Sequence, residues 1–109
     1  MNENPEQEKI RQLQLSEQKL QNLLMQKQQF QVQLNDVDSA SAELKNSKQS
    51  YKIIGTVMVK KESAELEKEL EEKRKIVELR IKSLEKQEDN IRQKAKQLQE
   101  EVLGNMNKK

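Results

Sequence analysis

The sequence of 109 residues contains no cysteine, no histidine and no tryptophan. Without cysteine the chain forms no disulfide and offers no thiol nucleophile, which is usual for proteins of a reducing compartment. The absence of histidine removes the commonest acid–base catalyst and metal ligand at neutral pH. The sequence also has no phosphate-binding glycine loop and no pattern of metal ligands. We therefore predict no enzymatic activity, no cofactor and no metal site.

Bulky apolar residues are scarce as well. Apolar residues make up 32% of the chain, and Phe30 and Tyr51 are its only aromatic residues, whereas an ordinary globular domain is about 45–50% apolar. No apolar run approaches the roughly 18 residues that span a bilayer, and the N-terminus lacks the basic and apolar segments of a signal peptide. We expect a single cytoplasmic subunit, residues 1–109, with no membrane partner and with a long narrow seam as its core.

Charge of one sign is not concentrated anywhere. Charged residues are 37% of the chain, with a net charge of +2, and acids and bases alternate in both halves. No basic arm or aromatic cluster is available for phosphates and bases, so we predict no nucleic-acid partner. The acidic run from Glu65 to Glu72 is typical of a solvated helix face with i,i+4 ion pairs.

Heptad spacing predicts two long helices. Asn4 and Pro5 are typical of a helix start, and the first helix is predicted over residues 5–46. The second helix is predicted over residues 62–104, where Gly104 provides a stop, followed by a frayed tail over 105–109. Seven-residue rows of a coiled-coil seam run through both helices. In the first helix they are Leu13, Leu20, Lys27, Leu34 and Ser41, with Ser16, Leu23, Phe30, Val37 and Leu44; in the second, Leu70, Val77, Leu84, Ile91 and Leu98, with Glu67, Arg74, Ile81, Glu88, Ala95 and Val102.

Residues 50–61 form the one β-like segment. β-Branched residues lie on both sides of Gly55, and Gly55-Thr56 suits a type II′ hairpin turn. An isolated two-stranded hairpin is marginally stable, and its open edges pair with other chains. We therefore predict that the hairpin oligomerises; the alternative is a plain bend that packs on its own helices. The predicted assembly residues are Tyr51, Ile53, Ile54, Gly55, Val57, Met58 and Val59.

Folding the chain back about the Gly55–Thr56 bond pairs residues whose numbers add up to 111. Apolar seam residues then meet along both helices, as in an antiparallel coiled coil. The rival is a register shifted by one heptad. Three polar mismatches remain in the predicted register: Lys27 with Leu84, Leu23 with Glu88, and Leu44 with Glu67. The fold class is thus predominantly α, a two-helix antiparallel coiled-coil hairpin with one short β-hairpin at its bend.

The segment Tyr51-Lys52-Ile53-Ile54-Gly55-Thr56-Val57-Met58-Val59-Lys60 resembles the β-type prefoldin family. That family carries Tyr-Lys-x-x-Gly-x-x-x-Val-Lys between two coiled-coil helices, and residues 79–88 are similar to its second helix. The resemblance implies a hetero-hexamer of two α-type and four β-type subunits, in which the hairpins form a multi-chain β-barrel. It further implies an ATP-independent holdase that captures non-native polypeptides and hands them to a group II chaperonin.

The fold-back brings the chain ends together, where apolar residues extend beyond the strict seam. A loose apolar tip suits clients of no fixed shape. The alternative for these residues is that they only seal the coiled coil. For the whole chain, the alternative function is a structural coiled-coil adaptor that binds one defined partner. The predicted client-binding residues are Ile10, Leu13, Leu15, Leu98, Val102, Leu103 and Met106.

Overall fold

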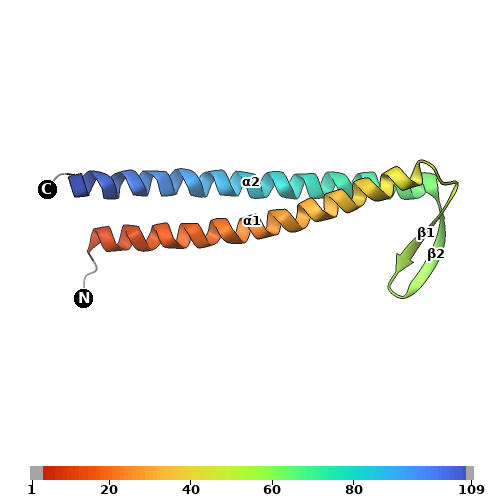
Figure 1. Cartoon of the computed structure of the whole chain (residues 1–109), viewed down its shortest axis with the longest axis horizontal. Helices are drawn as coiled ribbons and strands as arrows, with labels where there is room; N and C mark the ends of the chain where they lie inside the picture. Colours follow the sequence, from red (N-terminus) through yellow and green to blue (C-terminus); the bar gives the residue numbers. More distant parts are fainter. Residues whose placement is uncertain (1–3, 108–109) are drawn as a thin grey trace. The chain divides into compact units, whose positions relative to one another are not determined.

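A computed structural model describes residues 4–107, except for the side chains of residues 105–107. Its elements follow the order α1 (Pro5–Leu44), β1 (Gln49–Ile54), β2 (Val57–Glu62) and α2 (Ser63–Asn107) (Figure 1). The contacts divide the chain into two compact units. The end unit consists of α1 up to Gln28 and α2 from Lys82, and the hairpin unit is Gln29–Ile81. In the described residues, no helix is long and apolar enough to cross a membrane.

Local hydrogen bonds determine where α1 begins and ends. Asn4 accepts a hydrogen bond from the Glu6 backbone N–H through its side-chain oxygen, at 3.2 Å, and this caps the first turn. At the other end, the backbone N–H groups of Asn46 and Ser47 donate to the carbonyls of Glu43 and Leu44, each at 3.2 Å. These i→i−3 bonds tighten the chain into a turn. The helix therefore ends at Leu44, and the predicted end at residue 46 is wrong by two residues.

The other predicted boundaries need small corrections too. β1 begins at Gln49 and β2 ends at Glu62, so the hairpin extends one residue beyond the predicted range on each side. α2 begins at Ser63, one residue after the predicted start. The helix continues through Gly104 to Asn107, so the predicted stop at 104 is wrong. Among residues 4–107 only Gly55 has a positive φ. Gly104 therefore does not adopt the left-handed conformation, and the helix continues through it. A glycine ends a helix only where it adopts the left-handed conformation.

The predicted seam is confirmed along α1, where every seam position is buried or half-buried. Leu23 and Val37 are its buried members, and Val77, Ile81 and Leu84 are their buried counterparts on α2. In the hairpin unit, the Arg80 guanidinium lies over the Phe30 ring, 5.6 Å from its centroid. Each unit thus holds a narrow apolar core between antiparallel helices, with the fold class that the heptads predict.

Near the hairpin, the seam of α2 departs from the predicted rows. Leu66 is buried while Glu67 is half-buried, so the inward-facing position lies one residue earlier than predicted. A straight helix drifts by about 20° per heptad against a 3.5-residue repeat, which displaces the row. Arg74 is exposed because its guanidinium pairs with Asp38 at 2.9 Å. Its place in the predicted seam is therefore wrong.

Residue pairs confirm the register in each unit. All strand pairs follow the predicted rule, from Gln49 opposite Glu62 to Ile54 opposite Val57. In the hairpin unit, Asp38 contacts Arg74, one residue from its predicted partner. In the end unit, Lys9 Nζ lies 3.0 Å from Glu101 Oε2, again one residue away. A shift of one heptad would displace these partners by a full seven residues, so that rival is excluded.

Two of the predicted polar mismatches in the seam pair with each other. Glu88 is only 2% exposed, and Lys27 Nζ lies 2.8 Å from its Oε1. Arg92 donates to the other oxygen, Oε2, at 3.4 Å. Glu88 Oε1 has no hydrogen bond of good direction, so the Lys27 contact is an ion pair of close charges. The long lysine side chain reaches the acid from the edge of the seam.

Candidate assembly surface and client-binding tip

The β-hairpin turns at Gly55 and Thr56. Gly55 has φ of 61°, and no other described residue has a positive φ. A type I′ turn needs positive φ at both central residues, whereas type II′ needs it only at the first. The geometry is therefore that of the predicted type II′ turn, and Gly55 is the residue without which the two strands would not connect so tightly.

The hairpin exposes apolar side chains on both faces. Alternation along paired strands places Ile53 and Met58 on one face and Ile54 and Val57 on the other. Each strand has a single neighbour, so this two-stranded sheet has two open edges. The exposed fractions range from 38% for Val59 to 69% for Ile53. The exposed apolar side chains are Tyr51, Ile53, Ile54, Val57, Met58 and Val59.

These exposures do not match the plain-bend alternative, in which the hairpin covers its apolar residues with its own helices. Burial is worth about 25 cal/mol per Å² of apolar surface, and the hairpin realises little of it. Open edges combined with apolar faces are the features of a strand pair that is completed by other chains. The binding of other subunits by these residues stays a proposal.

Serine hydroxyls form hydrogen bonds at the base of the hairpin. Ser50 is buried, and its hydroxyl donates to the Lys61 carbonyl at 3.0 Å. The Ser63 hydroxyl, at the start of α2, donates to the Ser47 carbonyl at 2.8 Å. These bonds hold together the two points where the chain enters and leaves the sheet.

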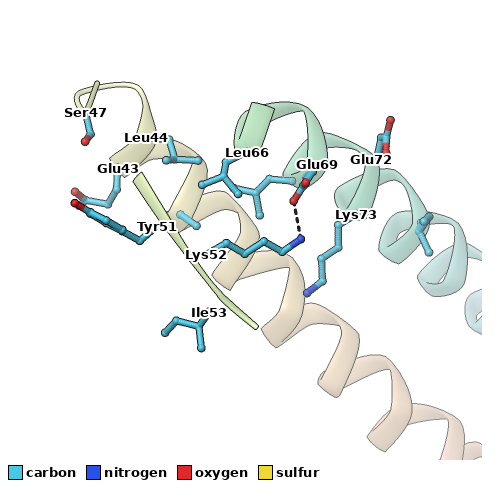
Figure 2. Close-up of a pocket in the computed structure, with 13 residues that line it drawn as sticks. Glu43, Leu44, Ser47, Tyr51, Lys52, Ile53, Leu66, Glu69, Glu72 and Lys73 are labelled. Carbon is cyan, nitrogen blue, oxygen red and sulfur yellow. Dashed lines mark hydrogen bonds and ion pairs between the residues drawn. The ribbon is translucent and has the colours of Figure 1, made fainter. Parts of the chain in front are cut away.

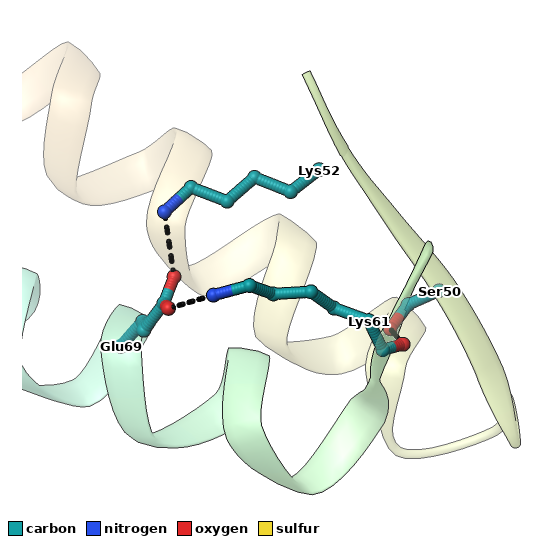
Figure 3. Close-up of polar contacts among 4 residues, drawn as sticks. All are labelled: Ser50, Lys52, Lys61 and Glu69. Carbon is teal, nitrogen blue, oxygen red and sulfur yellow. Dashed lines mark hydrogen bonds and ion pairs between the residues drawn. The ribbon is translucent and has the colours of Figure 1, made fainter. Parts of the chain in front are cut away.

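One carboxylate of α2 contacts both strands (Figure 3). Lys52 of β1 donates to Glu69 Oε2 at 2.9 Å, and Lys61 of β2 donates to Oε1. The hydrogen bonds from Lys61 and Lys52 hold the pKa of Glu69 below its ordinary value. The hydrogen bond to Glu69 raises the pKa of Lys61 above its ordinary value. Each group is thus stabilised in its charged form.

A hollow of about 900 Å³ lies between β1 and the two helices. Figure 2 shows Leu44 and Leu66 on the helices, Ile53 on the strand, and the Lys52–Glu69 contact at its wall. Leu70 and Ile76 add further apolar surface from α2. The hollow is mainly apolar with a charged rim, and it offers no set of groups for chemistry on a bound molecule.

The predicted client-binding residues fall into two groups in the end unit. Ile10, Leu15 and Leu103 are 45%, 48% and 59% exposed. The seam residues Leu13, Leu98 and Val102 are half-buried, as residues that seal a coiled coil would be. Met106 is also a predicted client-binding residue, but its side chain lies outside the described part of the chain.

Comparison with known proteins agrees with this architecture. A family model described as "Prefoldin subunit" matches residues 7–108. The prefoldin subunit beta of Archaeoglobus fulgidus is 34% identical over 96 residues, which cover 85% of this chain and 83% of the relative. The protein of the same name from Methanospirillum hungatei is 35% identical over 99 residues, which cover 88% and 82%.

A solved structure leads to the same family. The crystal structure of the prefoldin beta subunit from Thermococcus strain KS-1 is similar with a TM-score of 0.87, at 32% identity and with 94% of each chain covered. The chain belongs to the prefoldin β-subunit family. The resemblance seen in the hairpin sequence is therefore confirmed.

Membership in the prefoldin family decides several of the predictions. Prefoldins are chaperones without enzymatic activity, so the prediction of a chaperone subunit that is not an enzyme is confirmed. Membership also implies assembly with other prefoldin subunits. The individual client-binding and assembly residues stay predictions.

Sequence reasoning missed the polar contacts that join the prefoldin hairpin to its helices. The sequence predicts a solvated face with i,i+4 partners for Glu69, but the ion pairs of Glu69 are with strand lysines. Strand alternation alone places Ser50, Lys52 and Lys61 on one face, and this signal was available. The sequence does not tell which acid contacts these lysines, because the run from Glu65 to Glu72 contains several glutamates.

Proposed function

We propose that this prefoldin β subunit is part of an ATP-independent holdase, which captures non-native polypeptides at the ends of its coiled coils. The observation that carries the proposal is the exposure of Ile10, Leu15 and Leu103, each at least 45% accessible in the end unit. Scattered exposed apolar side chains suit clients that present no fixed shape.

The same proposal includes the assembly. We propose that β-hairpins of several subunits close into a β-barrel, in a hexamer of two α-type and four β-type subunits. Two open strand edges and apolar residues on both faces support this arrangement, because closure of a sheet removes its edges. Transfer of clients to a group II chaperonin and a cytoplasmic location complete the proposal.

The first test is light scattering of two unrelated denatured proteins diluted into the assembled complex. In the tip variant, Ile10→Ser, Leu15→Ser and Leu103→Ser remove the exposed apolar side chains. The control variant carries Met25→Ser, Val32→Ser and Leu79→Ser, at positions that are 60%, 58% and 65% exposed. It removes three exposed apolar side chains from elsewhere on the helices.

A tip-capturing holdase keeps both client proteins from aggregating, loses this in the tip variant and keeps it in the control variant. Equal scattering with and without the complex would reject the holdase and leave the structural adaptor in its place. Equal loss in both variants would show that capture is spread along the helices. Client transfer is tested separately, by following a labelled client from the complex to a group II chaperonin without nucleotide.

A further inference from the structure

The hairpin has few connections to the helices that carry it. Its strands pair with each other along their full length, and among the described side-chain hydrogen bonds only those of Ser50, Lys52 and Lys61 join a strand to α2. The serine bonds at the base involve Ser47, Ser50 and Ser63, all close to the points where the chain enters and leaves the sheet. Bonds at a base leave a sheet free to rotate about it. A contact farther out is needed to determine the angle.

Glu69 provides that contact through Lys52, while Lys61 ties the same carboxylate to the base, opposite Ser50. Lys52 lies two residues after Ser50 along β1, and Ser50 is paired with Lys61 on β2, so both lysines lie on the same face of the sheet. Their ammonium groups meet the two different oxygens of one carboxylate. A carboxylate held from both strands opposes rotation of the sheet in either direction, as a single ion pair would not.

Other charged groups surround the site without replacing Glu69. Glu65 lies near enough to Lys61 to favour its charged form. Glu43, Glu72 and Lys73 line the same hollow (Figure 2). Among the described ion pairs, however, Glu69 is the only acid joined to either strand lysine. The angle of the hairpin therefore depends on one side chain of α2.

We propose that Glu69 is a positioning residue for subunit assembly: its two ion pairs hold the β-hairpin at the angle at which neighbouring prefoldin subunits bind it. The inference rests on the proposed assembly through hairpins. Glu69 itself contacts no partner in this mechanism, and it acts only through Lys52 and Lys61.

Weak contacts are sufficient for this role. Exposed ion pairs contribute little to overall stability, so loss of Glu69 should leave the coiled coil intact. Orientation of a sheet that is otherwise free to rotate requires little energy, and the effect is repeated in every β subunit of the complex. We expect Glu69→Gln to weaken assembly by about tenfold and to reduce its dependence on salt, since exposed pairs are screened by ions.

The angle can be measured directly in the full-length chain. Because the protein contains no cysteine, Thr56→Cys and Lys75→Cys introduce unique sites for spin labels on the turn and on α2. We expect a narrow distance distribution in the parent protein and a broad one with Glu69→Gln. Glu71→Gln is the matched control, since Glu71 is exposed on the same helix. Glu69→Asp keeps the charge on a shorter side chain. Its distance distribution should have a width between those of the parent protein and of Glu69→Gln.

Assembly is then measured by sedimentation with the partner subunits. A broadened distribution together with weakened assembly, seen with Glu69→Gln and with Lys52→Met plus Lys61→Met, supports the inference. An unchanged distance distribution overturns it, as does a broadened one with unaltered assembly. Thermal melting followed by circular dichroism shows whether each variant keeps its helices, and so distinguishes a changed hairpin angle from unfolding of the coiled coil. If Val57→Asp leaves assembly intact, the hairpin interface itself fails, whatever Glu69 does.

Discussion

The coiled coil and the hairpin are both built from aliphatic residues, yet they treat them in opposite ways. In the helices, Val77 and Leu84 are 3% and 7% exposed, because each lies against the facing helix. In the hairpin, Ile53 and Val57 are 69% and 58% exposed, although cross-strand pairing is complete. The coiled coil buries its apolar residues within the chain, whereas the hairpin leaves its apolar residues exposed.

The difference follows from geometry. Two helices that fold back on each other shield a shared stripe from water without any third element. A two-stranded sheet has neither a covering layer nor closed edges, and its own helices supply no cover here. The helices therefore bury their apolar side chains within one chain, while the hairpin leaves its apolar side chains exposed. Membership in a family of multi-subunit chaperones agrees with this contrast.

The largest effect is expected from a charge in the hairpin. Val57→Asp should abolish assembly with partner subunits, because a buried unpaired carboxylate costs several kcal/mol in an apolar interface. Val32→Asp is the matched control, since Val32 on α1 is also 58% exposed. Size-exclusion chromatography with light scattering measures both. Equal assembly of the two variants would contradict the proposed interface.

A smaller effect is expected in the seam. Leu84→Ala should lower the free energy of unfolding by about 2–4 kcal/mol, because it leaves a cavity between the helices. Leu79→Ala, at a position 65% exposed on the same helix, should change it by no more than about 0.5 kcal/mol. Urea unfolding followed by circular dichroism at 222 nm compares the two. A similar loss in both would mean that the seam is not the core.

The buried ion pair should have an intermediate effect that depends on how it is removed. Lys27→Met leaves the Glu88 carboxylate in the seam with only Arg92 nearby, and should cost about 1–3 kcal/mol. Lys27→Leu combined with Glu88→Leu removes both charges and should restore stability to at least the parent level. A double variant less stable than Lys27→Met alone would argue against this. Thermal and urea unfolding give the answer.

The smallest effect is expected at the surface. Asp38 and Arg74 form an ion pair with side chains 49% and 48% exposed, and such pairs contribute about 0–1 kcal/mol. Asp38→Ala should therefore lower stability by at most about 1 kcal/mol, and less in high salt. The urea midpoint at low and high salt measures this. A loss as large as that of Leu84→Ala would show that the hairpin unit depends on this charge pair.

The charges at the hairpin base can be tested by titration. Because its folded pKa is lowered, Glu69 stabilises the fold above about pH 4.3, the ordinary glutamate value, and loses this as pH falls through the folded pKa. Lys61, with a raised pKa, contributes below about pH 10.4 and loses it as pH rises through its folded pKa. Carboxyl carbon NMR should show a low midpoint for Glu69, and Lys52→Met with Lys61→Met should return it to about 4.3. An unchanged midpoint would mean that the ion pairs do not form.

Much of the fold was predictable because its signals are local and repeated. Seven-residue rows of aliphatic residues identified both helices and the burial of Leu23, Val37 and Leu84. A glycine between two β-branched runs located the turn. One prediction failed where neighbouring residues compete for the same seam position, since Leu66 is buried in preference to Glu67. Another failed at Gly104, which stays helical because glycine permits the left-handed conformation but does not require it.

The sequence by itself determined the two helices, the hairpin turn and their antiparallel pairing, because each depends on spacing along the chain; the contacts of the structure then excluded the register shifted by one heptad. Only the tertiary structure decided which charges meet. Lys27 pairs with Glu88, and Glu69 pairs with Lys52 and Lys61, since these contacts depend on side-chain lengths and on distances between segments far apart in sequence. The same reason explains why seam residues could be recognised from their period, whereas the acid that holds the hairpin could not.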